Sequence, residues 1–407
     1  MSTTMSPVPA PQNQPAPLRQ VLILAGDSDG NLGDKAIVRS TCDELHRLNP
    51  GVHIYIKSNL PEAYCATYFR ATPIPRGPRG WLATLRAATG ADLVLVGGGG
   101  LYQDDDSLVK MPYWGLKVAL VRLFARRMVT YAIGAGPLHS RLGRVFARLA
   151  LACTERISVR DHTGQAALAP LTRRPVTIVP DPALLLRAAP GQRLPEALRK
   201  VLDQAEGPVI GVALREWFHQ TRTFIPHKYA VKYRLRKVPG QAERARFYPL
   251  MAAALDAIAA ASGATLVFLP SYNVGHEGDH DCCRRVMAQM QCGRAHLFLL
   301  DDPLDYLALG PRLSLLISAR LHPVILCTSV GIPAIGLAYN PKFSGYFEKL
   351  GLTDHLMDLG EFQSEAACRR LHDLALATLS APPDVAQAID KQKQCLLEFN
   401  KEVMRRS

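Results

Sequence analysis

Short apolar runs alternate with longer segments of helical spacing along most of this chain. In its first half we expect strands at 20–25, 52–57, 91–96, 129–133, 156–160 and 176–179, with helices at 36–48, 80–89, 116–125 and 141–152. Strands that alternate with helices in this way are typical of a parallel sheet with helices on both of its faces.

The same alternation starts again after a polar segment, 187–207, that carries several Pro and Gly residues. Strands are expected at 209–214, 264–269, 296–300, 313–317 and 332–337, and helices at 248–261, 324–329 and 384–405. A chain of 407 residues exceeds one ordinary hydrophobic core, so we expect two domains. Their predicted limits are a disordered tail at 1–17, an N-terminal domain at 18–190, a C-terminal domain at 207–380, and a helix at 381–407 that packs across both.

Strong hydrogen-bond donors follow two of the strands in the second half. Arg320 and His322 come directly after the apolar run 313–317, and Pro323 suits the first position of the next helix. Lys342 lies just beyond the strand at 332–337. Ligands of open parallel sheets bind at the carboxyl ends of the strands, so these donors are expected to face one crevice. The alternative is an arginine paired to a helix carboxylate and a histidine satisfied in the core.

A loop of small and polar residues, 26–35, joins the first strand to the first helix. Its backbone N–H groups would favour an anion, as at a helix N-terminus. Its three aspartates would repel a phosphate, so a neutral polyol suits Asn31, Gly33 and Asp34 better. The loop lacks both the glycine spacing of the dinucleotide fingerprint and the lysine of a P-loop.

Two further strand ends carry candidate residues. Four consecutive glycines, Gly97–Gly100, follow the strand at 91–96 and let the backbone approach a ligand closely, although they could equally serve tight packing of strand and helix. Arg160 ends the strand at 156–160, where it could enter a cleft or pair locally with Asp161.

The composition narrows the class of protein. A hydrophobic content of 48% and a charged content of 20% fit a soluble globular enzyme. The net charge of +13 favours anionic partners such as phosphorylated substrates, nucleic acid or an anionic membrane face. No basic tract is interleaved with aromatic residues and no nucleic-acid motif is present, so nucleic acid is not expected as a partner.

Cysteine usage and the termini indicate a reducing compartment. The nine cysteines form no C-x-x-C pair, which argues against a disulfide framework or a zinc site. The first 17 residues lack the features of a signal peptide, and no apolar run reaches the ~18–20 residues of a membrane span. We therefore expect a cytoplasmic protein.

Two segments of the second half remain open to interpretation. The His, Asp and Cys residues at 276–283 match no metal-site spacing, and a solvated helix start explains them as well. The basic, poorly periodic segment 219–240 is typical of an insertion or a mobile loop over the cleft.

Taken in order, a set of motifs between residues 20 and 355 resembles the polysaccharide pyruvyl transferase family. The motifs are Gly30–Asp34, Ala91-Asp92 with Gly97–Gly100, Ile133–Pro137, Ser158–Asp161, Asp181–Ala183, Arg320–His322, Gly331–Pro333 and Tyr339–Lys342. Each motif is common, but the ordered set is specific. The proline-rich leader and the 219–240 segment depart from the family, and the latter could shape the site for the sugar.

The resemblance implies an α/β fold of two Rossmann-like domains facing a central cleft, as in GT-B glycosyltransferases, with the acceptor on the N-terminal side and the donor on the C-terminal side. It also implies an activity: the pyruvyl group of phosphoenolpyruvate moves onto two hydroxyls of a sugar in a cell-surface polysaccharide precursor. The products are a cyclic pyruvate ketal and phosphate.

The candidate residues suit that chemistry. Arg160, Arg320 and Lys342 could hold the carboxylate and phosphate of the donor, because arginine forms paired hydrogen bonds and lysine supplies a point charge. His322, titrating near neutrality, is the expected general acid that protonates the methylene carbon. Asp34 and Asp105 are candidates for accepting the hydroxyl proton.

The remaining candidates line the acceptor side, namely Asn31, Gly33, Gly98 and Gly99. The reaction requires neither a metal nor a cofactor in principle. The acceptor is expected to be a sugar or a lipid-linked oligosaccharide, and the basic chain could contact the inner face of the membrane that carries it.

Two rival functions share this pattern. A nucleotide-sugar glycosyltransferase would use the same cleft but would be stabilised by UDP or GDP instead of phosphoenolpyruvate. A non-catalytic glycan-assembly protein would tolerate loss of His322. The complete set of Arg320, His322 and Lys342 argues against the second rival.

Overall fold

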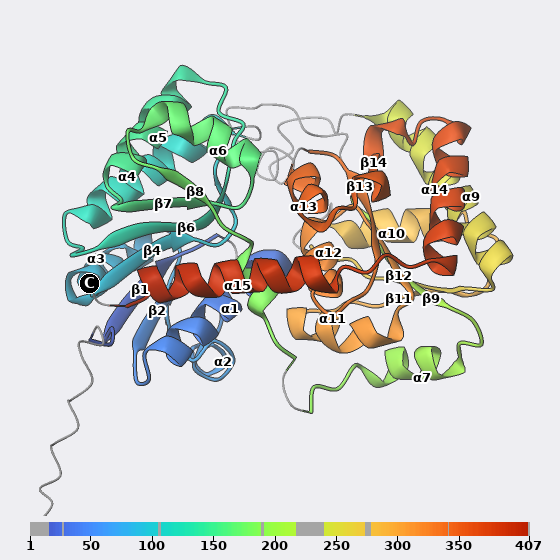
Figure 1. Cartoon of the computed structure of the whole chain (residues 1–407), viewed down its shortest axis with the longest axis horizontal. Helices are drawn as coiled ribbons and strands as arrows, with labels where there is room; N and C mark the ends of the chain where they lie inside the picture. The colour runs from blue at the N-terminus through green and yellow to red at the C-terminus, as the bar shows by residue number, and fades with distance from the viewer. Residues whose placement is uncertain are drawn as a thin grey trace, which may run out of the picture.

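The computed structural model describes residues 16–26, 28–104, 107–188, 191–216, 240–272, 278–340 and 342–405. Most of the predicted tail, the segment 219–239 and the candidate Asp105 lie outside these residues. Within them the chain forms two parallel sheets, each flanked by helices, which lie side by side (Figure 1). The expectation of an α/β protein with two Rossmann-like halves is confirmed.

The first sheet has the strand order β3-β2-β1-β4-β6-β7-β8, with β5 paired to β6. Its strands are β1 (Gln20–Leu24), β2 (His53–Lys57), β3 (Thr72–Ile74), β4 (Leu93–Gly97), β5 (Gly100–Tyr102), β6 (Met128–Ala135), β7 (Arg156–Val159) and β8 (Val176–Ile178). Every residue of β4 and β6 is buried, as expected for central strands of a parallel sheet covered on both faces.

The second sheet has the strand order β11-β10-β9-β12-β13-β14, again with all neighbours parallel. Its strands are β9 (Val209–Ala213), β10 (Thr265–Phe268), β11 (Ala295–Leu297), β12 (Leu315–Ser318), β13 (Ala334–Ala338) and β14 (Leu356–Asp358). The strand order reverses between β9 and β12, and such a switch point is where open α/β sheets bind ligands.

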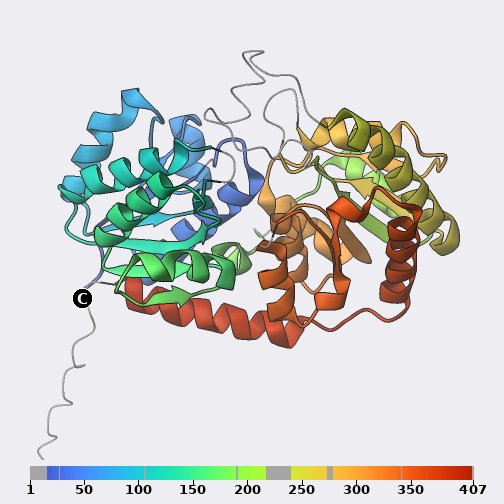
Figure 2. The same ribbon diagram turned by 90° about the horizontal axis from the view of Figure 1, so that it is seen from above.

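Helices cover both faces of each sheet, as the view from above shows (Figure 2). Around the first sheet they are α1 (Leu32–Leu48), α2 (Glu62–Tyr68), α3 (Trp81–Gly90), α4 (Lys110–Arg122), α5 (Arg141–Ala152) and α6 (His162–Leu168). Those that follow are α7 (Glu196–Gln204), α9 (Gln241–Ser262), α10 (Asp279–Met287), α11 (Pro303–Leu309), α12 (Leu321–Thr328), α13 (Lys342–Leu350), α14 (Glu365–Ser380) and α15 (Ala386–Val403). None of the described helices is long and apolar enough to cross a membrane.

Two helices join the halves. Ala36 and Ile37 of α1 belong to the apolar core of the second half, where they share a cluster with residues of α11 and α12. α15 runs along both halves (Figure 1): Ile389 packs into that same cluster, whereas Leu396 and Phe399 pack into the core beneath the first sheet. The predicted domain limits at 190 and 207 stay a prediction, with the two sheets spanning 20–178 and 209–358.

Several predicted boundaries are wrong. α1 begins at Leu32 and α4 at Lys110, each earlier than expected, because polar residues occupy the first turn of α1, and Pro112 and Gly115 interrupt the apolar pattern of α4. α12 begins at Leu321, so Pro323 is its third residue and not its first. The polar segment 187–207 contains α7. In the glycine run, Gly97 is the last residue of β4 and Gly100 is the first residue of β5.

Candidate active site

The carboxyl ends of the two sheets meet around a histidine. His322 lies in the first turn of α12, and its Nε2 is 3.4 Å from Nη1 of Arg160, which follows β7 of the other sheet. The same Arg160 nitrogen donates to Asp181, whose Oδ2 is 3.7 Å from His322 Nε2. These three side chains come from both halves of the chain, and the structure places Arg160 beside His322.

A second arginine is held by a carboxylate of its own half. Arg320 donates through Nε to Asp279 Oδ2 at 2.8 Å and through Nη2 to Asp279 Oδ1. Asp279, the first residue of α10, also accepts from the backbone amide of Tyr272 at 3.0 Å. The alternative of an arginine paired to a helix carboxylate thus describes Arg320 correctly, and the buried Asp279 is not part of a solvated helix start.

Lys342 reaches across to the first half. Its Nζ donates to Oε1 of Gln103, which follows β5. Tyr339, just after β13, packs its ring against Arg215, which follows β9, with the guanidinium 4.0 Å from the ring centroid. Arg215 and Tyr339 therefore join Arg320 and Lys342 at the carboxyl ends of the second sheet.

The cations of this site shift the pKa values of their neighbours. Burial, then the nearby Arg320, lowers the pKa of Arg215. Burial raises the pKa of the Tyr339 phenol, but Arg215, Arg320 and Lys342 outweigh it and lower that pKa overall. Asp181 pairs with Arg160 and Asp279 pairs with Arg320, and the charges of Asp161 and Asp34 also act on Arg160.

The expectation that His322 titrates near neutrality is wrong. Burial lowers its pKa to about 4, and Arg160, Arg320 and Lys342 act in the same direction against the opposing effect of Asp181. His322 is therefore a neutral imidazole at neutral pH until the surrounding charge changes.

Glycines let the facing loops approach these side chains. A Cβ at Gly33, in the first turn of α1, would lie 2.0 Å from Nδ1 of His322. A Cβ at Gly134, near the end of β6, would lie 2.5 Å from Nη2 of Arg160, and one at Gly100 would lie 3.1 Å from Nζ of Lys342. The glycine motifs thus leave room for the polar side chains of the site itself.

The other residues expected on the acceptor side lie in the same loops. Asn31 caps α1 by accepting the amide of Gly33 at 3.0 Å, and it forms a backbone bridge to Tyr272 of the other half. Asp34 is buried between two glycine turns, because a Cβ at Gly26 or Gly99 would come within 2.5 Å of its carboxylate oxygens.

Gly98 faces Ala25, which directly follows β1. A Cβ added at Gly98 would lie 3.1 Å from the Cβ of Ala25. Gly98 has a φ of +81°, a conformation that favours glycine. Asp105 lies outside the described residues, so its predicted role remains a prediction.

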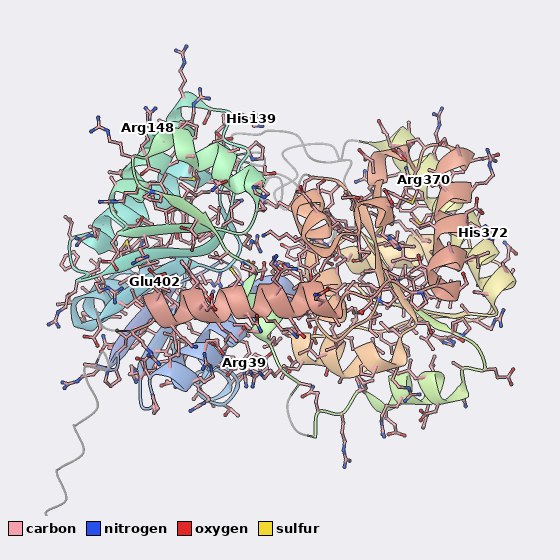
Figure 3. The ribbon with its side chains drawn as sticks, in the orientation of Figure 1. Arg39, His139, Arg148, Arg370, His372 and Glu402 are labelled. Atoms are coloured by element: carbon pink, nitrogen blue, oxygen red, sulfur yellow. The ribbon has the colours of Figure 1, made fainter. Side chains whose placement is uncertain are left out.

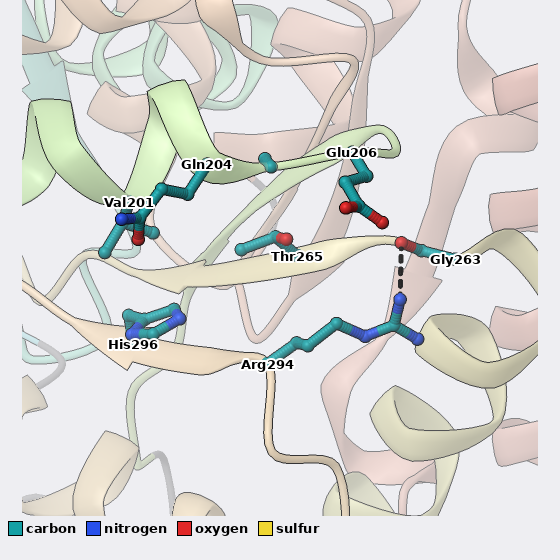
Figure 4. Close-up of a pocket in the computed structure, with 8 residues that line it drawn as sticks. Val201, Gln204, Glu206, Gly263, Thr265, Arg294 and His296 are labelled. Atoms are coloured by element: carbon teal, nitrogen blue, oxygen red, sulfur yellow. Dashed lines mark hydrogen bonds between the residues drawn. The ribbon is translucent and has the colours of Figure 1, made fainter.

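A separate pocket lies at the opposite edge of the second sheet. Its lining includes Thr265 of β10, His296 of β11 and Arg294, which donates to the carbonyl of Gly263 at 3.0 Å (Figure 4). These residues lie at the amino ends of the strands, away from the cations described above. Among the described residues no group of three or more His, Cys, Asp or Glu side chains could hold a metal ion.

Five residues of this site were not predicted as functional: Gln103, Asp181, Arg215, Asp279 and Tyr339. The sequence could have indicated Arg215, because this residue follows the strand next to the one that Arg320 follows. Asp279 carries none, since its partner lies 41 residues away and is set by tertiary folding.

Comparison with known proteins identifies the relatives of this chain. A family model described as polysaccharide pyruvyl transferase matches residues 31–341, which include every described candidate residue except Lys342. No curated protein matches the chain.

Several solved structures share its fold. The chain is similar to a putative UDP-N-acetylglucosamine 2-epimerase from Listeria monocytogenes, with a TM-score of 0.56 and 13% identity over 95% of this chain and 98% of the other. It is also similar to the UDP-GlcNAc 2-epimerase of Methanocaldococcus jannaschii, with a TM-score of 0.55 and 11% identity over 93% and 99% of the two chains. The enzyme from Neisseria meningitidis, bound to UDP-GlcNAc, gives a TM-score of 0.52 and 13% identity over 93% and 100%. At these identities the likeness shows a common GT-B fold alone.

Proposed function

Since this chain belongs to the polysaccharide pyruvyl transferase family, we propose that it transfers the pyruvyl group of phosphoenolpyruvate to two hydroxyls of a sugar, with formation of a cyclic ketal and release of phosphate. The observation that carries this proposal is the gathering of Arg160, Arg215, Arg320 and Lys342 at the carboxyl ends of the two sheets, where their charges lower the pKa values of His322 and Tyr339.

The donor is well matched to that cluster. Phosphoenolpyruvate carries a carboxylate and a phosphate on the same carbon, and guanidinium groups bind both through paired hydrogen bonds. Arg215 and Lys342 are candidates to hold the new charge, because both lie at the carboxyl ends of the second sheet, Arg215 against the ring of Tyr339 and Lys342 against Gln103.

Donor binding would also change the state of His322. Three cations, together with burial, lower the pKa of His322 to about 4. A bound polyanion neutralises them, so the pKa rises and the imidazole takes up a proton. The protonated His322 then delivers that proton to the methylene carbon of the donor, and positive character develops on the neighbouring carbon.

The remaining steps involve the acceptor. One sugar hydroxyl attacks the carbon that gained positive character, phosphate leaves, and the second hydroxyl attacks the same carbon to close the ketal. The two hydroxyls lose two protons, of which one replaces the proton given by His322 and the other leaves with phosphate. Asp34 is a candidate for fixing the positions of the turns at Gly26 and Gly99, which face the acceptor, since its carboxylate lies between these two turns.

The acceptor and its location belong to the same proposal. We propose a sugar of a cell-surface polysaccharide precursor, free or lipid-linked, which enters from the loops around Asn31, Gly33 and Gly99. The reaction would take place in the cytoplasm, where phosphoenolpyruvate is available, without a metal or another cofactor.

Thermal denaturation with added ligands tests the donor. A ligand at about 100 times its dissociation constant stabilises a protein by about 2.7 kcal/mol, which raises the melting temperature measurably. Phosphoenolpyruvate should raise it in the wild type and not in Arg320→Ala, whereas UDP and GDP should have no effect. Stabilisation by a nucleotide alone would support a glycosyltransferase instead.

Turnover provides the second test. Phosphoenolpyruvate should release phosphate only when a sugar acceptor is present, and His322→Gln should abolish that release while it keeps donor binding. A variant without His322 that retains full activity would refute the assigned proton transfer.

A further inference from the structure

Exposed apolar side chains are concentrated on one side of the first half. Among the described residues twelve large hydrophobic side chains are strongly exposed, and ten of them lie on α3, α4, α5 or the ends of α4. Soluble proteins rarely gather such side chains without a function for them. This outer side lies away from the second half of the molecule (Figure 1).

The exposed side chains form a stripe on each of two neighbouring helices. The stripe on α4 and its ends consists of Val109, Tyr113, Leu116, Leu120 and Leu123, and the stripe on α5 consists of Leu142, Val145 and Leu149. Successive members are three or four residues apart, which places each set on one helix face. α4 therefore has two apolar faces, and the sheet covers only one of them.

The two stripes adjoin each other. α4 and α5 cross closely at Gly115, where a Cβ would lie 2.7 Å from the carbonyl oxygen of Phe146. Leu116 and Val145 are the chain neighbours of these two residues, and both are more than half exposed. We call the combined surface of the two stripes the α4–α5 face.

Arginines border the α4–α5 face. Arg141, Arg144 and Arg148 are exposed, and each precedes a member of the α5 stripe by one residue, so they form a parallel row. The ion pairs of the described residues include none of these three. Figure 3 shows Arg148 at the outer side of the first half.

Acidic residues are missing from this part of the sequence. From Ser107 to Thr154 there are eight lysines and arginines and not one aspartate or glutamate. The α3 segment, Pro78–Ala91, likewise contains two arginines and no acidic residue. The face is therefore apolar at its centre and positively charged around it.

We propose that the α4–α5 face docks onto an anionic lipid bilayer. Leucine and aromatic side chains enter the boundary between headgroups and acyl chains, while neighbouring arginines remain at the level of anionic headgroups. Contact with a second copy of this chain fits less well, because a two-fold interface would pair this face with the same face, whose segment from Ser107 to Thr154 holds no carboxylate to neutralise the arginines.

The orientation that results connects the surface with the cleft. α4 begins a few residues after Gln103, the partner of Lys342, and α5 follows His139 and Ser140, whose amides donate to Asp104. Both helices thus start at the edge of the first sheet that carries the candidate site. If the acceptor is lipid-linked, as the proposed function allows, docking would place the cleft beside it.

Vesicle co-sedimentation of the full chain tests this surface without using activity. The wild type should bind vesicles that contain phosphatidylglycerol and should not bind vesicles of phosphatidylcholine alone, and salt should weaken the binding. The double variant Leu116→Gln/Leu142→Gln should bind at least about tenfold more weakly, because it loses two apolar side chains that would become buried in the bilayer. The triple variant Arg141→Glu/Arg144→Glu/Arg148→Glu should bind about a hundredfold more weakly or not at all.

Matched controls change the same chemistry elsewhere. Leu299→Gln/Val330→Gln replaces the other two exposed large apolar side chains of the described residues. Arg312→Glu/Arg369→Glu/Arg370→Glu makes the same change of net charge on the second half, where Figure 3 labels Arg370. Both controls should bind vesicles nearly as the wild type does, and circular dichroism should show that all variants remain folded.

Two outcomes would overturn the proposal. In the first, the α4–α5 variants and the controls bind vesicles equally well. In the second, sedimentation velocity shows a dimer that the α4–α5 variants convert to monomers while vesicle binding is unchanged. The second result would assign the face to self-association.

Discussion

At the scale of single residues, His322 links the candidate chemistry to the stability of the fold. Its pKa is lowered from 6.5 to about 4, so the unfolded chain binds a proton at pH values where the folded chain does not. The free energy of unfolding should therefore fall as the pH decreases from 6.5 to 4, by up to about 3 kcal/mol from this residue.

Denaturant titrations of the wild type and His322→Gln at several pH values measure that contribution. Protonation of the buried carboxylates lowers the free energy of unfolding of both proteins in acid. The difference in free energy of unfolding between the two proteins therefore gives the contribution of the histidine. Identical pH dependence in both would show that His322 is not held neutral by its surroundings. In NMR spectra of the wild type, phosphoenolpyruvate should raise the pKa of His322.

Arg215 gives a second prediction at this scale. Because burial and Arg320 disfavour its charge, Arg215→Met should leave the melting temperature of the free protein unchanged or higher. It should weaken donor binding by roughly ten- to hundredfold, which corresponds to the loss of a hydrogen bond to a charged group, about 1.5–3 kcal/mol. Calorimetric titration measures the affinity for phosphoenolpyruvate of the wild type, of Arg215→Met and of a control, Arg369→Met, which changes an exposed arginine. Equal affinity in all three would exclude Arg215 from the donor site.

The candidate residues that could be predicted are those that lie just after the carboxyl end of a strand. Arg160, Arg320 and Lys342 each follow a strand or its adjoining turn, and parallel sheets collect such positions at one edge. Their partners could not be predicted, because Asp279 and Gln103 meet Arg320 and Lys342 only after distant elements pack. The pKa of His322 also depends on both halves, so no local pattern indicates it.

At the scale of elements, the strands were predicted more accurately than the helix starts. A buried parallel strand is a continuous apolar run, which the sequence shows directly. A helix start is set by capping, as at Asn31, and the polar first turn of α1 looks like loop in the sequence. Short helices such as α6 and α11 were missed because seven residues give too little periodicity.

The first turn of α1 supplies a prediction at this scale. Gly33→Ala should force α1 and α12 apart or displace His322, since the added Cβ would lie 2.0 Å from its ring nitrogen. We expect a loss of about 1–3 kcal/mol of unfolding free energy and a larger proportional loss of turnover. Gly293→Ala is the matched control, because a Cβ there meets nothing within 4 Å.

Thermal melts and phosphate-release assays of these two variants measure the effect. In an ordinary helix position Ala would stabilise the protein by about 0.5–1 kcal/mol relative to Gly. A Gly33→Ala protein that is more stable than the wild type and fully active would therefore contradict the close packing described here.

At the scale of the whole molecule, α15 fastens the two halves together. Phe399 stacks on Tyr131 of β6, and the Tyr131 hydroxyl donates to Asn400 at 2.7 Å, while Lys393 donates to the carbonyl of Ser329 in the other half at 3.0 Å. Phe399→Ala should cost about 3–5 kcal/mol of unfolding free energy, because it leaves a cavity in the first core.

Chemical denaturation of Phe399→Ala and of the exposed Lys401→Ala measures this cost. Lys401 lies on the same helix with its side chain in solvent, so its variant should match the wild type. An equally small effect for both would show that α15 contributes little to the first core.

The path of α15 has a consequence for the order in which the protein assembles. The core under the first sheet includes Leu396, Phe399, Val403 and Met404, and Asn49 donates to the carbonyl of Met404 at 2.8 Å. A ribosome releases these residues only after both sheets have been synthesised. The half that is translated first is therefore the last to complete its core, and nascent chains stalled before residue 396 should expose an apolar groove that chaperones can bind.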